Sequence, residues 1–567
     1  MSTILDIIRQ ILPRGTVLQA PDGQPAWDEC PFWPPDLFAI AATLVERGSI
    51  YTRPWMYAAP SDERDHPALT SKHAGLAVMA GAVHRATGTS LYAQRRWKLL
   101  VRRYGGCPVS ALADRGDRRN ARLQRIVVQL MCVADEAAEG IGFPVDHRPG
   151  NGMSPVSEAA RLAHDAFVEA MRHPGDAPQG PLPHLPHSLC CLVPDHVACV
   201  LPKTTLPSVG CTLRGLSRNL ALLPSCGIVK ASWLLASNDT RSAPSDRLNL
   251  LIIPFPFDID GQALTPIPST GADRAQYFSI NFSGYHLPAN VRTLASARAT
   301  LKHLIARATA QIGTIHGVVF PEYAMADRLA RPLARSMARD HPGLEIVVAG
   351  TLGRASENAA LASNLALIAR FENGQRLRTW SQSKHHRWKL DPFQIRRYQM
   401  GHALDVNHDW WECIDIDQRV CNFSIIRNRL SLAVLICEDL ARMDPVMPVV
   451  HAIGPSLVIA LLMDGPQLEA RWCGRYATAL AEDPGSSVLS VTSTALIHRS
   501  AGKRGDAVIA LWKEAGGLAR ELAIGADDHG LALSLARVPR ELITLDGRKS
   551  GDHNRHLSLV SACPVRL

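Results

Sequence analysis

The sequence predicts a mixed α/β protein, of the α+β kind, preceded by a mostly α-helical N-terminal region. The chain has 567 residues, too many for one hydrophobic core, so we expect more than one domain. In residues 1–180 the apolar positions repeat at helical spacing, whereas residues 247–567 contain short apolar runs rich in branched residues, which are typical of buried strands. These strands outnumber the helices and some follow one another as hairpins, which favours mixed sheets covered by helices.

Composition and charge narrow the class of protein. No segment approaches 18 uninterrupted apolar residues, so we expect no membrane span, and Asp6 inside the first apolar run indicates an amphipathic helix rather than a signal peptide. The 13 cysteines are scattered, which indicates reduced thiols and a cytoplasmic protein. The net charge of +9 allows contact with nucleic acid, but the Lys and Arg residues form no long run. We interpret the charge as a solvated basic surface, so a nucleic-acid partner is without support in the sequence.

The N-terminal region, residues 1–180, is predicted to be an α-helical domain to which we assign no role. Asp36 is expected to cap a helix that begins at Leu37. Further helices are predicted over residues 68–87, 91–104, 121–139 and 155–172. The stretch 92–104 is basic with interleaved aromatic residues; contact with nucleic acid is one reading, and we interpret it as an amphipathic surface helix.

Residues 181–246 form a connector that is rich in histidine and cysteine. The cluster consists of His184, His187, Cys190, Cys191, His196, Cys199, Cys211 and Cys226. These residue types bind zinc, but the spacing matches no paired zinc-ligand pattern, so we expect buried cysteines with loop histidines and no metal. The polar segment 236–246 separates two kinds of structural pattern, and we place a domain boundary there.

The predicted strands of the C-terminal part follow in order, separated by helices over about 290–311 and 468–482. They cover residues 248–257, 317–322, 344–351, 363–371, 376–383, 419–427, 432–437, 456–463, 487–492, 507–513 and 531–536. Three of them end at a side chain that could carry chemistry: Glu322, Lys384 and Cys437. A nearby ammonium favours the thiolate, a carboxylate can take its proton, and the cation can stabilise negative charge that develops on an attacked carbonyl oxygen or nitrile nitrogen. We therefore expect Cys437 to be the most reactive of the thiols.

Three motifs resemble the carbon–nitrogen hydrolase (nitrilase) superfamily. They are Phe320-Pro-Glu322-Tyr323, a lysine that ends a strand after an Asn-Gly turn, and Ile436-Cys437-Glu438-Asp439. The sequence of the third motif is similar to that in the glutaminase domains of NAD synthetases. The resemblance covers about residues 247–567. It implies an α-β-β-α sandwich that pairs through its outer helical layer into a homodimer or a higher homo-oligomer. It also implies cleavage of a non-peptide C–N bond in a small amide or nitrile, without a cofactor.

The resemblance also implies roles for single residues. Cys437 resembles the nucleophile that forms a thioester, Glu322 the general base and Lys384 the cation that stabilises the oxyanion. Four further residues are expected to shape the substrate pocket: Tyr323, Glu438, Asp439 and Asp464.

The region after the predicted lysine departs from the family pattern. Lys389 is the alternative to Lys384, because it is followed by leucine as in many family members; we prefer Lys384 because it ends the strand. Many members carry a second glutamate shortly after the lysine, whereas the nearest acid here is Asp391. The segment 400–411 is an insertion that we expect to form a lid.

Two other functions stay open at this point. In the first, the protein is a signalling or phage-defence effector in which the helical region senses a partner and regulates the hydrolase. In the second, it is a non-catalytic member used for assembly; the intact Glu, Lys and Cys argue against that role.

Overall fold

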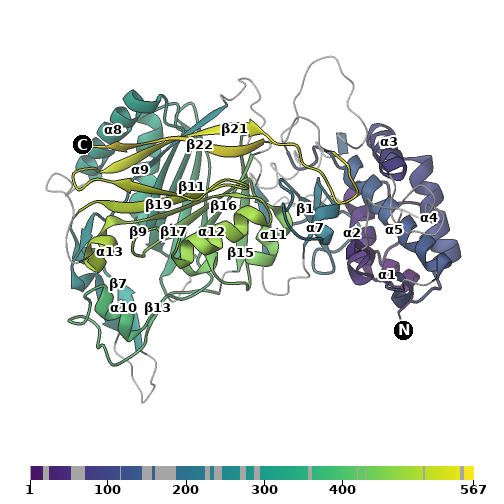
Figure 1. Ribbon diagram of the computed structural model, residues 1–567, viewed down its shortest axis with the longest axis horizontal. Helices are drawn as coiled ribbons and strands as arrows, with labels where there is room; N and C mark the ends of the chain where they lie inside the picture. The colour runs from purple at the N-terminus through teal and green to yellow at the C-terminus, as the bar shows by residue number, and fades with distance from the viewer. Residues whose placement is uncertain are drawn as a thin grey trace.

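The computed structural model places a helical N-terminal region at one end and a two-sheet sandwich at the other (Figure 1). It describes residues 2–16, 24–52, 71–114, 117–143, 156, 158–159, 187–223, 230–234, 246–267, 276–286, 294–354, 361–417, 419–427, 430–501, 505–549 and 555–567. Apart from 156, 158 and 159, the predicted helix over 155–172 lies outside these residues, as do His184 and Cys226 of the connector. Within the described part of the chain, none of the helices has the length and apolar character that crossing a bilayer requires.

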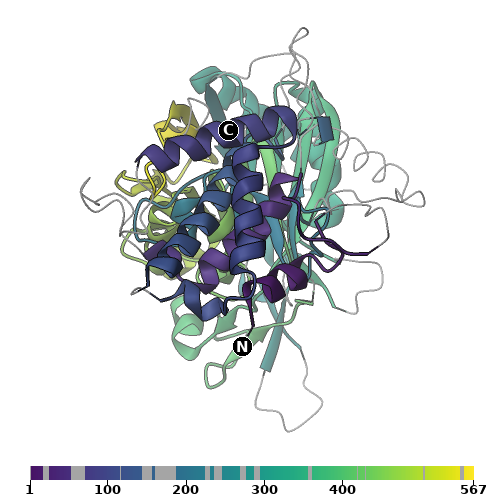
Figure 2. The same ribbon diagram turned by 90° about the vertical axis from the view of Figure 1, so that its right-hand side faces the viewer.

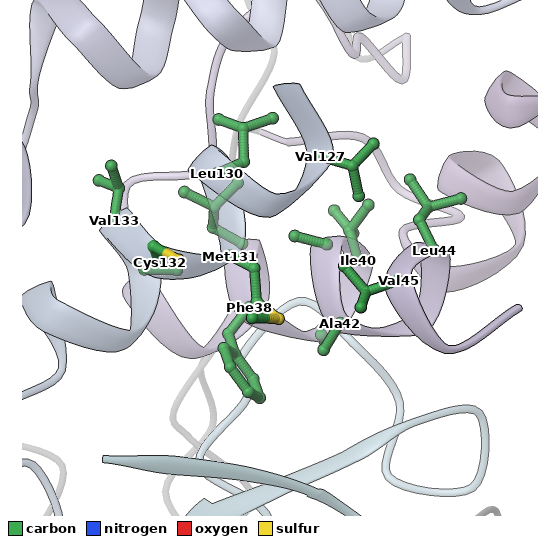
Figure 3. Close-up of a cluster of buried hydrophobic side chains, with 14 of the residues drawn as sticks. Phe38, Ile40, Ala42, Leu44, Val45, Val127, Leu130, Met131, Cys132 and Val133 are labelled. Carbon is green, nitrogen blue, oxygen red and sulfur yellow. The ribbon is translucent and has the colours of Figure 1, made fainter. Parts of the chain in front are cut away.

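Five helices form the N-terminal region. They are α1 (Ile4–Ile11), α2 (Pro34–Arg47), α3 (Ser71–Thr87), α4 (Leu91–Tyr104) and α5 (Arg118–Ala137). The apolar faces of α2 and α5 meet at the centre of this core, where Phe38 and Met131 lie among smaller aliphatic side chains (Figure 3). The helix start predicted at Leu37 is displaced, because α2 begins at Pro34 and proline suits a first helical turn. Asp36 lies inside that turn, fully buried, and accepts hydrogen bonds from the backbone N–H groups of Cys191 and Leu192.

The connector contains a two-stranded sheet of its own and one strand that joins a sheet of the sandwich. Strands β1 (Cys199–Pro202) and β2 (Leu220–Leu223) pair with each other, and α7 (Leu213–Leu216) lies between them in sequence. Strand β3 (Lys230–Leu234) pairs in parallel with β15 at the edge of a sheet of the sandwich. The boundary near residue 246 stays a prediction; the structure adds that a strand from before it belongs to that sheet. Among the described residues, no group of three or more His, Cys, Asp or Glu side chains is arranged to hold a metal ion.

The C-terminal part contains two seven-stranded sheets. The first has the order β12-β11-β10-β9-β4-β21-β22, and the second β20-β19-β18-β17-β16-β15-β3. The strands of the first sheet are β4 (Arg247–Ile252), β9 (Gly317–Ala326), β10 (Ile346–Gly353), β11 (Ser363–Glu372), β12 (Gln375–Ser383), β21 (Gly530–Pro539) and β22 (Arg555–Val565). Those of the second, besides β3, are β15 (Val420–Arg427), β16 (Leu430–Ile436), β17 (Leu457–Leu462), β18 (Ser487–Thr492), β19 (Ala507–Lys513) and β20 (Arg520–Ile524). Both sheets mix parallel and antiparallel pairs, as predicted.

Helices cover the outer face of each sheet, so the sandwich has four layers (Figure 1). One apolar cluster fills the space between the sheets, with Val319 and Ile459 on its two sides. A second cluster packs α8 (Leu294–Ile312) and α9 (Asp327–Asp340) on the first sheet. A third packs α11 (Met447–Ile453) and α12 (Trp472–Glu482) on the second sheet. The α-β-β-α architecture expected from the resemblance is therefore confirmed.

A smaller unit lies beside the strand ends. It contains the sheet β13-β14-β7-β6, with β13 (Lys389–Leu390), β14 (Trp410–Glu412), β7 (Gln276–Ile280) and β6 (Leu264–Ile267), and the pair β5 (Asp258–Ile259) with β8 (Tyr285–His286). Helices α10 (Pro392–Arg397) and α13 (Thr494–Ala501) flank it. The expectation of a lid over 400–411 is wrong: Met400, Leu404 and Trp410 are buried in the apolar core of this unit.

A buried ion cluster joins the helical region to the end of the chain. Arg548 is fully buried and donates to Asp135 at 3.1 Å and to Glu136 at 2.7 Å, both at the end of α5. It also donates to Asp546 at 2.9 Å, while the thiol of Cys132 on α5 lies 3.2 Å from the same carboxylate. Because every partner is charged or hydrogen-bonded, this contact fixes α5 against residues 546–548.

Candidate active site

The three residues predicted from strand ends come together where the two sheets meet. Glu322 lies in β9, Lys384 directly follows β12, and Cys437 directly follows β16 as the first residue of the short helix η6 (Cys437–Leu440). The chain turns sharply at two of these points, because Tyr323 has a φ of 56° and Cys437 a φ of 46°, both in the left-handed region. For non-glycine residues such backbone is uncommon and concentrates at functional sites.

Gly350 explains how the turn at Glu322 is accommodated. The pairing of β9 with β10 shifts register between Ala349 and Thr351, so β9 bulges at Glu322. A Cβ atom on Gly350 would lie 2.2 Å from the carbonyl oxygen of Pro321 and 2.5 Å from the Cα of Glu322. Only glycine allows the two strands to approach this closely.

Lys384 is the centre of the site. Its side chain is fully buried, and its Nζ donates to Glu322 Oε1 at 2.8 Å and to Glu412 Oε2 at 2.8 Å. Burial alone would lower the pKa of Lys384, but the two carboxylates outweigh it and raise that pKa well above its ordinary value. The amine is therefore a permanent ammonium ion. Lys389, the alternative considered above, lies at the surface in an ion pair of 2.7 Å with Asp409.

Glu322 is held by three donors. Its carboxylate accepts hydrogen bonds from Lys384, from Asn364 Nδ2 at 2.7 Å and from the backbone N–H of Met463 at 2.7 Å. The Met463 bond comes from the end of β17, so it ties the second sheet to the first. Burial raises the pKa of Glu322, and Glu412 adds to this, while Lys384 opposes it; the net shift is upward. A raised pKa makes the carboxylate a better proton acceptor near neutral pH.

The second carboxylate, Glu412, was missed by the sequence analysis. It is 1% exposed and, besides Lys384, it accepts from Asn364 Nδ2 at 3.0 Å, from the backbone N–H of Trp388 at 2.7 Å and from the hydroxyl of Tyr323. The acid expected near the lysine, Asp391, instead caps α10 through the backbone N–H of Gln394. Glu412 ends the three-residue strand β14, which is too short to leave a periodic pattern, so no local signal pointed to it.

Cys437 is 3% exposed and lies in the electrostatic field of Glu322 and Lys384. Burial raises the pKa of the Cys437 thiol well above its ordinary value, Glu322 adds to the shift, and Lys384 opposes it. The resting group is therefore a neutral thiol, which must lose its proton as it attacks. The expectation that Cys437 is the most reactive thiol stays a prediction, and its burial and raised pKa both favour slow reaction with a general alkylating reagent.

The remaining predicted pocket residues divide into two groups. Tyr323 and Asp464 belong to the candidate site. The hydroxyl of Tyr323 donates to Glu412, and the charge of Asp464 contributes to the raised pKa of the Cys437 thiol. Asp464 accepts from Tyr398 Oη at 2.6 Å, Arg471 Nη2 at 2.9 Å and Trp472 Nε1 at 3.0 Å. Glu438 forms an ion pair of 2.6 Å with the exposed side chain of Arg442, and its charge also raises the pKa of the Cys437 thiol.

Asp439 connects the Cys437 turn to the Lys384 strand. Its fully buried carboxylate accepts from the backbone N–H of His385 at 3.1 Å and lies 2.9 Å from Nδ1 of His386. Burial alone would raise the pKa of Asp439, but these hydrogen bonds outweigh it and lower that pKa. Both carboxylate oxygens of Asp439 thus contact His385 or His386, which directly follow Lys384. Because Asp439 lies two residues after Cys437, these bonds fix the position of Lys384 relative to Cys437.

Comparison with known proteins adds the following findings. No family model matches the chain, and no curated protein sequence matches it. Among solved structures, it is similar to a glutamine-dependent NAD+ synthetase from Acinetobacter baumannii (11% identity, TM-score 0.32), over 56% of this chain and 48% of that one. It is also similar to Nit3 of Saccharomyces cerevisiae, a member of branch 10 of the nitrilase superfamily (10% identity, TM-score 0.28, 57% of this chain and 93% of that one). A third similar structure is a carbon–nitrogen hydrolase from Helicobacter pylori (10% identity, TM-score 0.27), over 55% of this chain and 88% of that one.

These neighbours are of the superfamily that the three sequence motifs indicated. The chain spans about half the length of the NAD+ synthetase that it matches. Because the identities and TM-scores are low, we base the functional proposal on the geometry of the site.

Proposed function

We propose that the protein is a cysteine-dependent hydrolase that cleaves the C–N bond of a small amide or nitrile. The observation that carries the proposal is the fully buried ammonium of Lys384, held 2.8 Å from both Glu322 and Glu412 beside Cys437. Burying one amine and two carboxylates costs stability unless every group is paired. Such an arrangement is typical of a site that must hold and move protons during a reaction.

The chemistry follows from the charge states. Sγ of Cys437 forms a bond to the carbonyl carbon while its proton passes to Glu322, and the carbonyl oxygen takes up negative charge. The ammonium of Lys384 and the backbone N–H groups in the first turn of η6, which have no partner within that helix, stabilise this charge. The C–N bond then breaks, the proton on Glu322 passes to the leaving nitrogen, and a thioester remains on Cys437. Glu322 next removes a proton from water, whose oxygen attacks the thioester carbon; the C–S bond breaks, the acid leaves, and the proton on Glu322 returns to Sγ of Cys437.

In this scheme Glu412 keeps Lys384 charged and in place. Without a second carboxylate, proton transfer to Glu322 would leave the buried ammonium with no anionic partner. Glu412 accepts a hydrogen bond from the same ammonium and is the second anionic partner in that step. Asn364, which donates to both carboxylates, keeps them apart.

Ammonia release tests the proposal. Purified protein is incubated with a panel of aliphatic and aromatic amides and nitriles, and free ammonia is measured beside the Cys437→Ala variant. We expect one or more compounds to be hydrolysed by the native protein alone. Turnover that survives Cys437→Ala would contradict the mechanism.

We further propose that two copies pair through α8 and α9. A groove of about 720 Å³ lies between these helices, lined in part by Leu294, Leu333 and Arg339, so the outer face is recessed and partly apolar. Light scattering after size exclusion should give a dimer, and Leu294→Glu, at a 46% exposed side chain that lines the groove, should give a monomer. A monomeric native protein would contradict the pairing.

A further inference from the structure

The positive charge of the protein is concentrated in one short stretch. Residues 91–125 hold ten Lys or Arg residues against two Asp, a net +8, whereas the whole chain carries +9. The ten are Arg95, Arg96, Lys98, Arg102, Arg103, Arg115, Arg118, Arg119, Arg122 and Arg125. Apart from Arg115, which lies outside the described residues, they belong to α4 and to the first turns of α5. The remaining 532 residues are thus almost neutral, and the charge of the protein is local.

Helix α4 separates its apolar and cationic sides. Its buried face consists of Ala93, Trp97, Leu100 and Tyr104. Arg95, Lys98 and Arg102 are exposed and recur at a spacing of three and four residues, so they form one row along the opposite face. Among the described residues, neither Arg95 nor Lys98 lies within ion-pair distance of a carboxylate. Arg102 faces Asp28 at 3.3 Å, but both side chains are more than 60% exposed, and such pairs are weak.

The start of α5 adds further cations to the end of this row. The guanidinium groups of Arg103 and Arg119 lie 6.0 Å and 5.9 Å from the centre of the same ring, that of Tyr104. The C-terminus of α4 and the N-terminus of α5 are therefore neighbours. Asp117 caps the start of α5 and accepts from the backbone N–H of Arg119 at 2.8 Å, so one carboxylate lies at this helix end. The exposed cations of the row and of Arg119 outnumber it, so the surface attracts an external anion.

We propose that this basic face, formed by Arg95, Lys98, Arg102, Arg103 and Arg119, is a docking surface for the phosphate backbone of double-stranded nucleic acid. A row of exposed cations on two neighbouring helices matches a regular line of phosphates. The aromatic side chains that interleave the basic ones in sequence, Trp97 and Tyr104, are buried, so they offer no platform on which unpaired bases could stack. A duplex therefore fits this face better than a single strand.

An acidic membrane surface fits less well. A helix that lies in a membrane turns a broad apolar face toward the lipid. In α4 that apolar face is packed into the core of the helical region, and of its large apolar side chains Leu91 at the helix start is the strongly exposed one.

The face lies at the end of the molecule remote from the sandwich. Figure 1 places α4 at the right-hand end, and Figure 2, which views the molecule from that side, shows the N-terminal helices in front. A bound duplex would leave the Cys437 site open, so the two sites can be tested separately.

The test is binding of a fluorescently labelled DNA duplex of about two helical turns, followed by anisotropy over a range of salt concentrations. Binding should weaken as salt rises, and an RNA duplex of the same length should bind with similar affinity, because phosphates are contacted and not the sugar. The triple variant Arg95→Gln, Lys98→Gln, Arg102→Gln should bind about tenfold more weakly, and its slope of log affinity against log salt should fall by about 3.

The matched control is the triple variant Arg354→Gln, Arg376→Gln, Arg475→Gln. These three arginines are exposed on the sandwich and belong to neither α8 nor α9, and the change in net charge is the same. The control should bind the duplex as the native protein does, and both variants should keep the native circular dichroism spectrum. Three results would overturn the proposal: no duplex binding at low salt, an equal loss in both triple variants, or binding to anionic lipid vesicles in place of the duplex.

Discussion

Among the residues that the structure describes, two lysines are completely or almost completely buried, and they lie in opposite environments. Lys384, in the candidate active site, lies between two carboxylates, which raise its pKa well above the ordinary value. Lys203, in the connector, is 3% exposed and donates to backbone carbonyl oxygens, those of Arg214 and, at 2.9 Å, Ser217. Burial lowers the pKa of Lys203 to about 7, although Asp135 opposes the shift.

The difference shows what a buried amine needs to keep its charge. Carbonyl dipoles satisfy the hydrogen bonds of Lys203 but do not replace the hydration of a full charge. At Lys384 the charged carboxylates of Glu322 and Glu412 replace that hydration. One carboxylate would be enough to neutralise the ammonium, yet two are present. The second carboxylate keeps the ammonium paired if Glu322 takes a proton, which a purely structural lysine does not require.

The largest effect is expected from Lys384→Met, which keeps most of the side-chain volume and removes the charge. Turnover should fall by about a thousandfold or more, because the cation that stabilises the oxyanion is lost. The matched control is Lys203→Met, which removes a lysine of equal burial; its rate should stay within about twofold of the native rate. Steady-state kinetics of both variants on the same substrate checks the comparison, and equal losses in both would contradict it.

A smaller effect is expected from Glu412→Gln, which preserves the shape of the side chain and removes one negative charge. The rate should fall by about a hundredfold, because Lys384 and Glu322 are less firmly placed. Glu412 helps to raise the pKa of Glu322, so the acidic limb of the pH–rate profile should move to lower pH in the variant. An unmoved limb would show that Glu322 is not the group that titrates.

Lys384 and Cys437 could be found from the sequence because each directly follows a strand. Glu322 was predicted at a strand end, but it lies at a bulge inside β9, which continues to Ala326. Glu412 could not be found in this way. Its strand, β14, has three residues and is held by parallel pairing with β7, from more than 130 residues earlier in the chain. Asp391 was the nearer acid in sequence, but its side chain satisfies the first turn of α10. Local patterns place strands and helix caps, whereas a partner brought in by a distant strand depends on the tertiary fold.

The strand β3 illustrates the same limit for the domain organisation. Its five residues lie before the polar segment taken as a boundary, yet they pair with β15 inside the sandwich. A short strand flanked by polar sequence carries too little periodicity to be assigned to one sheet or another.

A moderate effect is expected from Asp439→Asn. Asparagine keeps the size of the side chain but replaces one acceptor oxygen by a donor, so the bonds from His385 and His386 cannot both be kept. The kcat should fall by about tenfold with little change in KM, because the Lys384 strand shifts relative to Cys437 while the rest of the pocket is intact. Arg442→Gln, on the exposed partner of Glu438, is the control and should leave both constants unchanged. A rise in KM alone would indicate that Asp439 binds substrate.

The smallest effect is a pH dependence of stability that distinguishes the two lysines. Native Lys203 loses its proton near pH 7, whereas the unfolded lysine keeps it up to about 10.5, so between these values the unfolded state binds more protons and stability rises with pH. Lys384 behaves oppositely, because its raised pKa gives stability that is lost only as pH rises beyond the unfolded value of 10.5. From pH 7.5 to 9.5 the free energy of unfolding of the native protein should rise, relative to Lys203→Met, by about 2–3 kcal/mol. Urea unfolding of both proteins at pH 7.5 and pH 9.5 measures this difference in free energy. A difference that does not change with pH would show that native Lys203 stays charged.

The central claim is that Cys437 forms a thioester while Glu322 serves as the base, and trapping that intermediate tests it most directly. The native protein is mixed with a hydrolysed amide or nitrile, quenched in acid during turnover and analysed by intact-protein and peptide mass spectrometry, beside the Glu322→Gln variant, which cannot accept the thiol proton and should form no adduct. The account predicts an added mass equal to the acyl group, located on the peptide that contains Cys437 and absent from the Cys437→Ala variant. Hydrolysis by the native protein with no adduct on Cys437 at any time, together with full turnover in Cys437→Ala, would contradict it.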